Sequence, residues 1–467
     1  ILIIDFNGHL NNTEKKFLHF RSGKRTLESD VFPLIKERML VKECMRHIAV
    51  AAFGMGTWLS VNAVYVELPL LVSFVPEGYD LATYIVLIVQ LACLFPLIYG
   101  ILDSKLASKE LWIRYNHAIL IPIMLFFSGA GLVMAAFVYD RPGVINNSKH
   151  SYWLFVAFFI MSIPCTTSDV LFMPYITKLE NTKYVATFFI GMGLSALVPS
   201  AASLIQGANA NLNGTAANPW GPTEGGVLFG PRIFLILMAA ICGLSLIGFI
   251  VLLKHKNEGS GDDLSKAILQ TPSNSLCSVE LSVIEKDGVH SYDLLESKSP
   301  IGVETISTFK WYLLLSISLL LGAVQNSVVP VILPYATQSY GQNIYHLASS
   351  LFVMTNPIFC FLQFFIIIKR IPIFVIWTII CLIFVTFGFV MALLPEKIDW
   401  HGMGPLLCVM FALASGFISW ERTAAAHVLR ETSSARGLFW CGAFTQIGSF
   451  IGALLMFLLS NVAHVFQ

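Results

Sequence analysis

Residues 53–72 read FGMGTWLSVNAVYVELPLLV, a run that contains one charged side chain, Glu67. An α-helix needs about 20 apolar residues to cross a hydrocarbon core of about 30 Å. Comparable runs recur along the 467-residue chain, which is 56% hydrophobic and only 12% charged, whereas a soluble domain carries about 25% charged residues. The sequence therefore predicts an all-α polytopic membrane protein.

Polar connections separate eleven such runs. The predicted spans are residues 47–73, 81–102, 112–138, 152–174, 185–206, 232–253, 311–336, 346–368, 372–394, 404–420 and 437–460. An acidic, serine-containing stretch lies between the sixth and seventh spans and predicts a disordered linker. The expected parts are a leader over 1–45, a six-helix bundle over 46–253, the linker over 254–310 and a five-helix bundle over 311–467. Residues 1–45 are basic and show little periodicity.

Positive charges predict the orientation, since connections rich in Lys and Arg stay in the cytoplasm. Alternate connections carry most of these residues, with Arg422, Arg430 and Arg436 assigned to the connection after the tenth span. The N-terminus is then cytoplasmic and the C-terminus extracellular. Sequons at Asn146 and Asn213 fall in predicted outer loops, where glycosylation is possible.

The sequence disfavours several classes of function. Its formal net charge of +1 gives no attraction to nucleic acid. No HExxH, Gly-x-Ser-x-Gly, Walker A or dinucleotide motif is present, which argues against an enzyme or an ATP-driven pump. The nine cysteines form no cluster of zinc spacing. We therefore expect no metal and no cofactor, with the lipid bilayer as a partner.

Polar side chains inside the bilayer are costly unless they face a cavity or a partner, so each is a candidate for a functional site. Trp58 and Asn62 lie four residues apart in the first span and share a helix face, with Tyr65 near the same line. Glu67 falls on the opposite side of an ideal helix, although a kink at Pro69 could turn it. An interfacial carboxylate in water is the alternative reading of Glu67.

Further candidates lie beside helix breaks in other spans, where transporters build central sites from freed backbone groups. Packing amides satisfied by neighbouring helices are the alternative reading. Glu67 and Asp169 are candidates for ion coupling as intramembrane acids. The other candidate substrate contacts are Gln325, Asn326, Tyr345, His346, Asn356 and Gln446.

The candidate set predicts the chemistry of a ligand. Amides and aromatic rings with no intramembrane Arg or Lys suit a flat, neutral, hydrogen-bonding molecule, because a phosphate or carboxylate would require a cation. A flavin and a nucleoside both meet that description. The residues alone do not choose between them.

A family resemblance extends these predictions. Residues 50–85, VAAFGMGTWLSVNAVYVELPLLVSFVPEGYDLATYI, closely resemble the first two helices of the riboflavin transporters, solute carrier family 52. SDVLFMPYI (168–176), YHLASSLFVMTNPIFCF (345–361) and TQIGSFIGALLMF (445–457) continue the resemblance. It implies a sodium-independent plasma-membrane carrier of riboflavin with a core similar to equilibrative nucleoside transporters and major facilitator-like proteins. Trp58, Asn62 and Glu67 stand in the family's first-helix motif. Family members begin shortly before the first span, so the resemblance implies that the natural start is Met39 or Met45.

Two residues depart from the family pattern: Asp169 stands where human-like members have Asn, and Met192 where they have Gln. The resemblance implies uptake of riboflavin by alternating access and leaves an influence of protons on uptake open. A nucleoside or other vitamin carrier on the same fold, and a membrane receptor that never translocates its ligand, are the alternatives.

Overall fold

The structure is a computed structural model. It describes residues 28–106, 110–145, 148–177, 182–207, 227–270, 307–363, 365–366, 368–394 and 402–466. Two compact units are present, residues 1–48 and 49–467. The second unit holds nearly all of the membrane-type helices and every residue discussed below as part of a site.

Helices dominate the described residues, with one small hairpin of β1 (Gly143–Ile145) and β2 (Ser148–His150). Ten helical segments among them are long and apolar enough to cross a membrane, and a bent pair adds an eleventh. The prediction of eleven spans is thus confirmed. The helices are α2 (Glu28–Met55), α3 (Leu59–Leu71), η1 (Gly78–Asp80), α4 (Leu81–Ala92), α5 (Leu94–Leu106), α6 (Glu110–Val138), α7 (Tyr152–Thr177), α8 (Thr182–Gln206), α9 (Pro231–Gln270), α11 (Thr308–Ala323), η3 (Val324–Val328), α12 (Val329–Gln338), α13 (Gln342–Leu362), α14 (Ile371–Leu393), α15 (Met403–Phe457) and η4 (Leu458–Val462).

The first span is broken near its middle. Its two helical parts, Val41–Met55 and Leu59–Leu71, meet at 54°, so the bend falls before Trp58 and not at Pro69. Close packing accounts for glycines here, because a Cβ on Gly54 would lie 2.5 Å from the carbonyl oxygen of Phe188 and one on Gly56 2.6 Å from the Leu125 side chain. Pro69 lies inside α3, two residues before its end.

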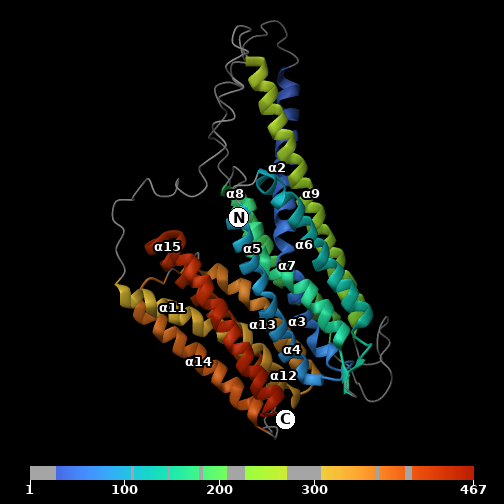
Figure 1. Ribbon diagram of the computed structural model, residues 1–467, viewed down its shortest axis with the longest axis vertical. Helices are drawn as coiled ribbons and strands as arrows, with labels where there is room; N and C mark the ends of the chain where they lie inside the picture. The colour runs from blue at the N-terminus through green and yellow to red at the C-terminus, as the bar shows by residue number, and fades with distance from the viewer. Residues whose placement is uncertain are drawn as a thin grey trace. The chain divides into compact units, whose positions relative to one another are not determined.

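The helices pack in two groups (Figure 1). In the N-terminal group α6 packs on α7 and α9, and in the C-terminal group α11, α13 and α14 pack on α15. Helices α3 and α8 contact α13, and α4 contacts α12 and α15, so these contacts join the groups. The second half of α15 approaches α11 closely, since a Cβ on Gly448 would overlap the carbonyl of Leu319.

Some predicted boundaries differ from the structure. Helix α9 continues to Gln270, so residues 254–270 of the predicted linker are helical. Helix α2 begins at Glu28, inside the predicted leader. The rest of the linker, 271–306, and both sequon asparagines, Asn146 and Asn213, lie outside the described residues.

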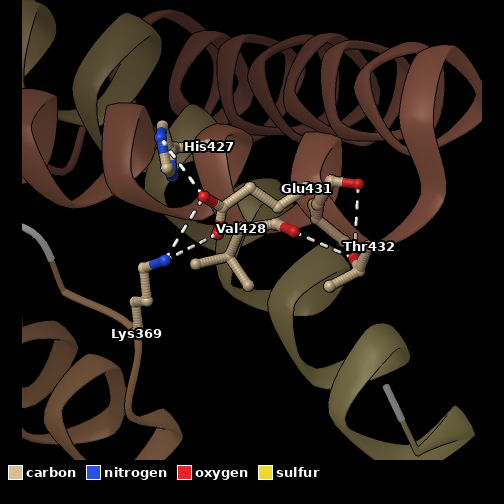
Figure 2. Close-up of polar contacts among 6 residues, drawn as sticks. Lys369, His427, Val428, Glu431 and Thr432 are labelled. Carbon is tan, nitrogen blue, oxygen red and sulfur yellow. Dashed lines mark hydrogen bonds and ion pairs between the residues drawn. The ribbon is translucent and has the colours of Figure 1, made fainter. Parts of the chain in front are cut away.

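The end of the first half of α15 makes an ion pair with the segment before α14. Figure 2 shows Lys369 directed at Glu431, with Nζ–Oε2 and Nζ–Oε1 distances of 3.1 and 3.3 Å, and His427 on the other side of the carboxylate. Both partners are largely exposed. Such a pair contributes no more than about 1 kcal/mol to stability.

Candidate functional site

Hydrogen bonds join the two helix groups at one end of the molecule, which we name the closed end and define by Asp80, Ser203, Tyr335, His346 and Ser460. The Tyr335 hydroxyl of α12 donates to Asp80 Oδ1 of η1. Ser460 Oγ of η4 lies 2.7 Å from the Tyr335 hydroxyl and donates to Asp80 Oδ1 at 3.3 Å. These contacts tie the N-terminal group to both α12 and the end of the last span.

A second cluster at the closed end contains two of the candidates predicted from sequence. His346 of α13 is buried, and its Nε2 lies 2.8 Å from Ser203 Oγ of α8. Tyr345 is buried beside it, with its ring 6.1 Å from that of Tyr79. Both side chains therefore lie between the two helix groups and are shielded from solvent.

Glu67 also lies near the closed end and is completely buried. Gln206 Nε2 of α8 donates to Glu67 Oε1 at 3.0 Å and to the carbonyl of Phe229 at 3.0 Å. Glu67 Oε2 has no hydrogen-bond partner among the described residues. A buried carboxylate half satisfied in this way requires a proton or a water molecule on the remaining oxygen.

A small cavity lies directly below the closed end and between the two groups. It has room for about one water molecule. A flat three-ring ligand does not fit there without separation of the helices. The lining residues are Tyr65, Leu68, Pro330, Leu333, Tyr345, Ser349, Phe352 and Val353.

Several candidate amides are satisfied within the protein. Asn62 Nδ2 donates to the carbonyl of Ser195 at 3.2 Å, inside the N-terminal group. Asn326 Nδ2 donates to Ser449 Oγ at 2.9 Å, inside the C-terminal group. These contacts fit the packing interpretation in the described conformation, although both side chains stay partly accessible.

Other candidates lie at the interface or at its margin. Gln446 is exposed, and its Oε1 accepts from Cys93 Sγ at 3.5 Å, a contact between the two groups. Asn356 is exposed and accepts from Cys360 Sγ at 3.7 Å. Trp58 is half-buried at the bend of the first span and packs against the main core. The candidates thus form no single cluster: Tyr65 and Tyr345 share a cavity, and the rest are distributed along the interface.

The prediction that no intramembrane cation exists is wrong. Helix α15 runs without a break through Arg422, so the tenth span extends over Met403–Thr432 and not over 404–420. Arg422 Nη1 donates to Gln325 Oε1 at 2.6 Å. Gln325 Nε2 in turn donates to Ser419 Oγ at 2.5 Å. A stripe of polar residues at 415, 419 and 422, on one helix face, is the sequence signal that could have placed Arg422 in the span.

Asp169 lies on the opposite group, in α7. Its side chain keeps accessible surface. The Arg422 guanidinium attracts it across the interface. Glu421, next to Arg422, is instead fully buried within the C-terminal group and accepts from Thr378 Oγ1 at 2.6 Å.

Comparison with known proteins decides the family. The sequence profile of solute carrier family 52, riboflavin transporter, matches residues 42–467. The chain belongs to this family. It is 32% identical to riboflavin transporter rft-1 and 30% identical to rft-2 of Caenorhabditis elegans, in each case over 90% of this chain and 96% of the relative. It is 29% identical to member 3 of the family from Bos taurus, over 90% of this chain and 97% of the relative.

Solved structures show that this member of family 52 has a major facilitator-like fold. A D-xylose–proton symporter matches with a TM-score of 0.52 at 16% identity, covering 91% of this chain and 92% of that one. A bacterial homologue of the human lysosomal transporter Spinster, in an inward-facing and unoccupied conformation, matches with a TM-score of 0.51 at 15% identity, covering 88% and 81%. The prediction of a two-bundle transporter fold is confirmed.

Proposed function

We propose that this protein takes up riboflavin across the plasma membrane by alternating access, and that it changes no covalent bond in its substrate. The observation that supports this proposal best is the match to the riboflavin transporter family over residues 42–467. Relatives named riboflavin transporters also align with this chain over nearly their whole length. We propose that the N-terminus is cytoplasmic and the C-terminus extracellular, with Asn146 and Asn213 glycosylated in outer loops.

The two-bundle packing supports a rocking mechanism. The closed end holds the bundles together through side-chain contacts from several helices, while Asp169, Asn356 and Gln446 keep accessible surface elsewhere. With the proposed orientation, the closed end faces outward. Opening it requires the loss of the contacts that Tyr335 and His346 make, and closing the opposite side completes the cycle.

We assign roles to the candidates from their chemistry. Trp58 and Tyr65 would stack on the flavin ring when the bundles separate. Asn62, Gln325, Asn326 and Gln446 would bond its heteroatoms and ribityl hydroxyls. Glu67 is the first candidate for a proton-linked acceptor, because it is buried and half satisfied, and Tyr345, His346 and Asn356 would border the outer path.

The experiment is uptake of radiolabelled riboflavin by cells that express the full chain. Lumiflavin and uridine serve as competitors, and Trp58→Ala serves as the impaired variant. Saturable accumulation blocked by lumiflavin and not by uridine is the expected result. Blockage by uridine would favour a nucleoside carrier, and saturable surface binding without accumulation would favour a receptor.

A further inference from the structure

Most N–H groups of the Arg422 guanidinium make no hydrogen bond to a described residue. Of its five N–H groups, Nη1 bonds Gln325 Oε1, and no other hydrogen-bond partner is present among the described residues. Gln325 is itself held by Ser419. The remaining donors are therefore fixed in place within a membrane span, where an unpartnered cation is costly unless a ligand or water meets it.

Asp169 is the matching group on the other bundle. It forms no hydrogen bond or ion pair with any described residue, although Arg422 attracts it. Thr166, one turn before Asp169, donates through Oγ1 to the carbonyl of Ala92 at 3.1 Å, and the adjacent Cys93 Sγ donates to Gln446 Oε1 of the other bundle at 3.5 Å. Arg422 bonds Gln325, whose neighbour Asn326 bonds Ser449, one turn from Gln446. These contacts place Asp169 and Arg422 on the same stretch of the interface.

Arg422 makes one hydrogen bond within its own bundle, to Gln325, and Asp169 makes none to a described residue. A tether between the bundles would place the two groups in direct contact, and they are not. Cys93 contacts Gln446 of the other bundle and interacts with Asp169. Opposite charges separated in this way present donors from one side and acceptors from the other.

From this arrangement we infer that Asp169 and Arg422 form a charge-balanced subsite that selects the neutral flavin over its phosphate monoester. The inference rests on the proposed function and names the specificity of that site. A flavin edge carries carbonyl oxygens on either side of a ring N–H. Arg422 donates to a carbonyl oxygen, and Asp169 accepts from the N–H.

The preference for riboflavin over its phosphate monoester follows from the opposite charges of Asp169 and Arg422. A lone guanidinium in a site of low dielectric would recruit a phosphate, which bears about −1.5 to −2 charges at pH 7. Asp169 cancels that attraction and leaves the donors of Arg422 available. The site therefore uses a cation for hydrogen bonding without becoming an anion site.

Equilibrium binding to the purified full chain tests the inference, with quenching of flavin fluorescence as the signal. The quantity is the ratio of the Kd for flavin mononucleotide to the Kd for riboflavin. Asp169→Asn should lower this ratio at least about tenfold, a change of about 1.4 kcal/mol, and Asp169→Glu should keep it. The matched control is Glu431→Gln, which removes a carboxylate from the exposed pair with Lys369 and should leave the ratio unchanged.

A second variant keeps the test decisive if Asp169→Asn does not fold. Arg422→Gln should weaken riboflavin binding about tenfold without favouring the phosphate, and Asp169→Asn/Arg422→Gln should have a ratio near that of the unaltered protein. An unchanged ratio in Asp169→Asn, or an equal fall in Glu431→Gln, overturns the inference. If the unaltered protein binds no riboflavin, the proposed function fails instead.

Discussion

The hydroxyl of Tyr335 offers a direct test of the closed end. Tyr335→Phe removes the hydrogen bond to the Asp80 carboxylate and the contact with Ser460 Oγ at 2.7 Å, and leaves the ring in place. A hydrogen bond to a charged group contributes about 1.5–3 kcal/mol and a neutral one about 1 kcal/mol. Asp80 keeps its bond from Ser460, so we take a loss near the lower end, about 2 kcal/mol. That loss shifts the ratio of closed to open molecules about 30-fold.

The assay is labelling of a cysteine in the cavity below the closed end. Ser349 lines that cavity and is buried, so Ser349→Cys reports opening when a membrane-impermeant maleimide is added outside the cell. Tyr335→Phe should raise the labelling rate up to about 30-fold over Ser349→Cys alone. Tyr312→Phe is the matched control, because Tyr312 is exposed. Equal labelling rates with and without Tyr335→Phe, at equal surface expression, would refute the role of these contacts.

Three further predictions concern a buried acid, a close helix contact and an exposed pair. Glu67→Gln should flatten the pH dependence of uptake, because an amide does not titrate; an unchanged pH profile removes Glu67 from proton coupling. Gly448→Ala should lower the free energy of unfolding by about 1–3 kcal/mol, because the added Cβ would overlap the Leu319 carbonyl. Gly442→Ala is the control, because Gly442 has open space around it; equal melting temperatures for the two variants would contradict this prediction. Lys369→Ala should cost less than about 1 kcal/mol in the same melting assay, and a larger loss would show a structural role for that pair.

The spans were predictable because each is a long apolar run, and the bilayer imposes one length on all of them. From the sequence, Pro69 is the position in the first span where a kink could form, since proline is the usual cause of one. In the structure the bend lies at Gly56–Trp58, between the end of α2 and the start of α3, where the backbone packs closely on neighbouring helices. Those contacts involve Leu125 and Phe188, which no local pattern around Gly56 reveals.

The closed end could not be predicted for a related reason. Asp80 and Tyr335 are 255 residues apart, and Asp80 and Ser460 are 380 apart. Each lies near a helix terminus, where a polar residue is ordinary and gives no sign of a partner. Only the packing of the two bundles brings them together.

Arg422 shows how a wrong span boundary changes a functional argument. With that span ended at residue 420, the absence of a membrane cation became the reason to expect a neutral ligand. The structure places Arg422 inside the span, and the same reasoning applied to it alone would predict an anionic ligand. In the proposed subsite Asp169 restores neutrality, because it lies on the other bundle and is attracted by Arg422. Selection of a neutral ligand then depends on two opposite charges: loss of Asp169 should favour the phosphate monoester, and loss of Arg422 should weaken the binding of riboflavin.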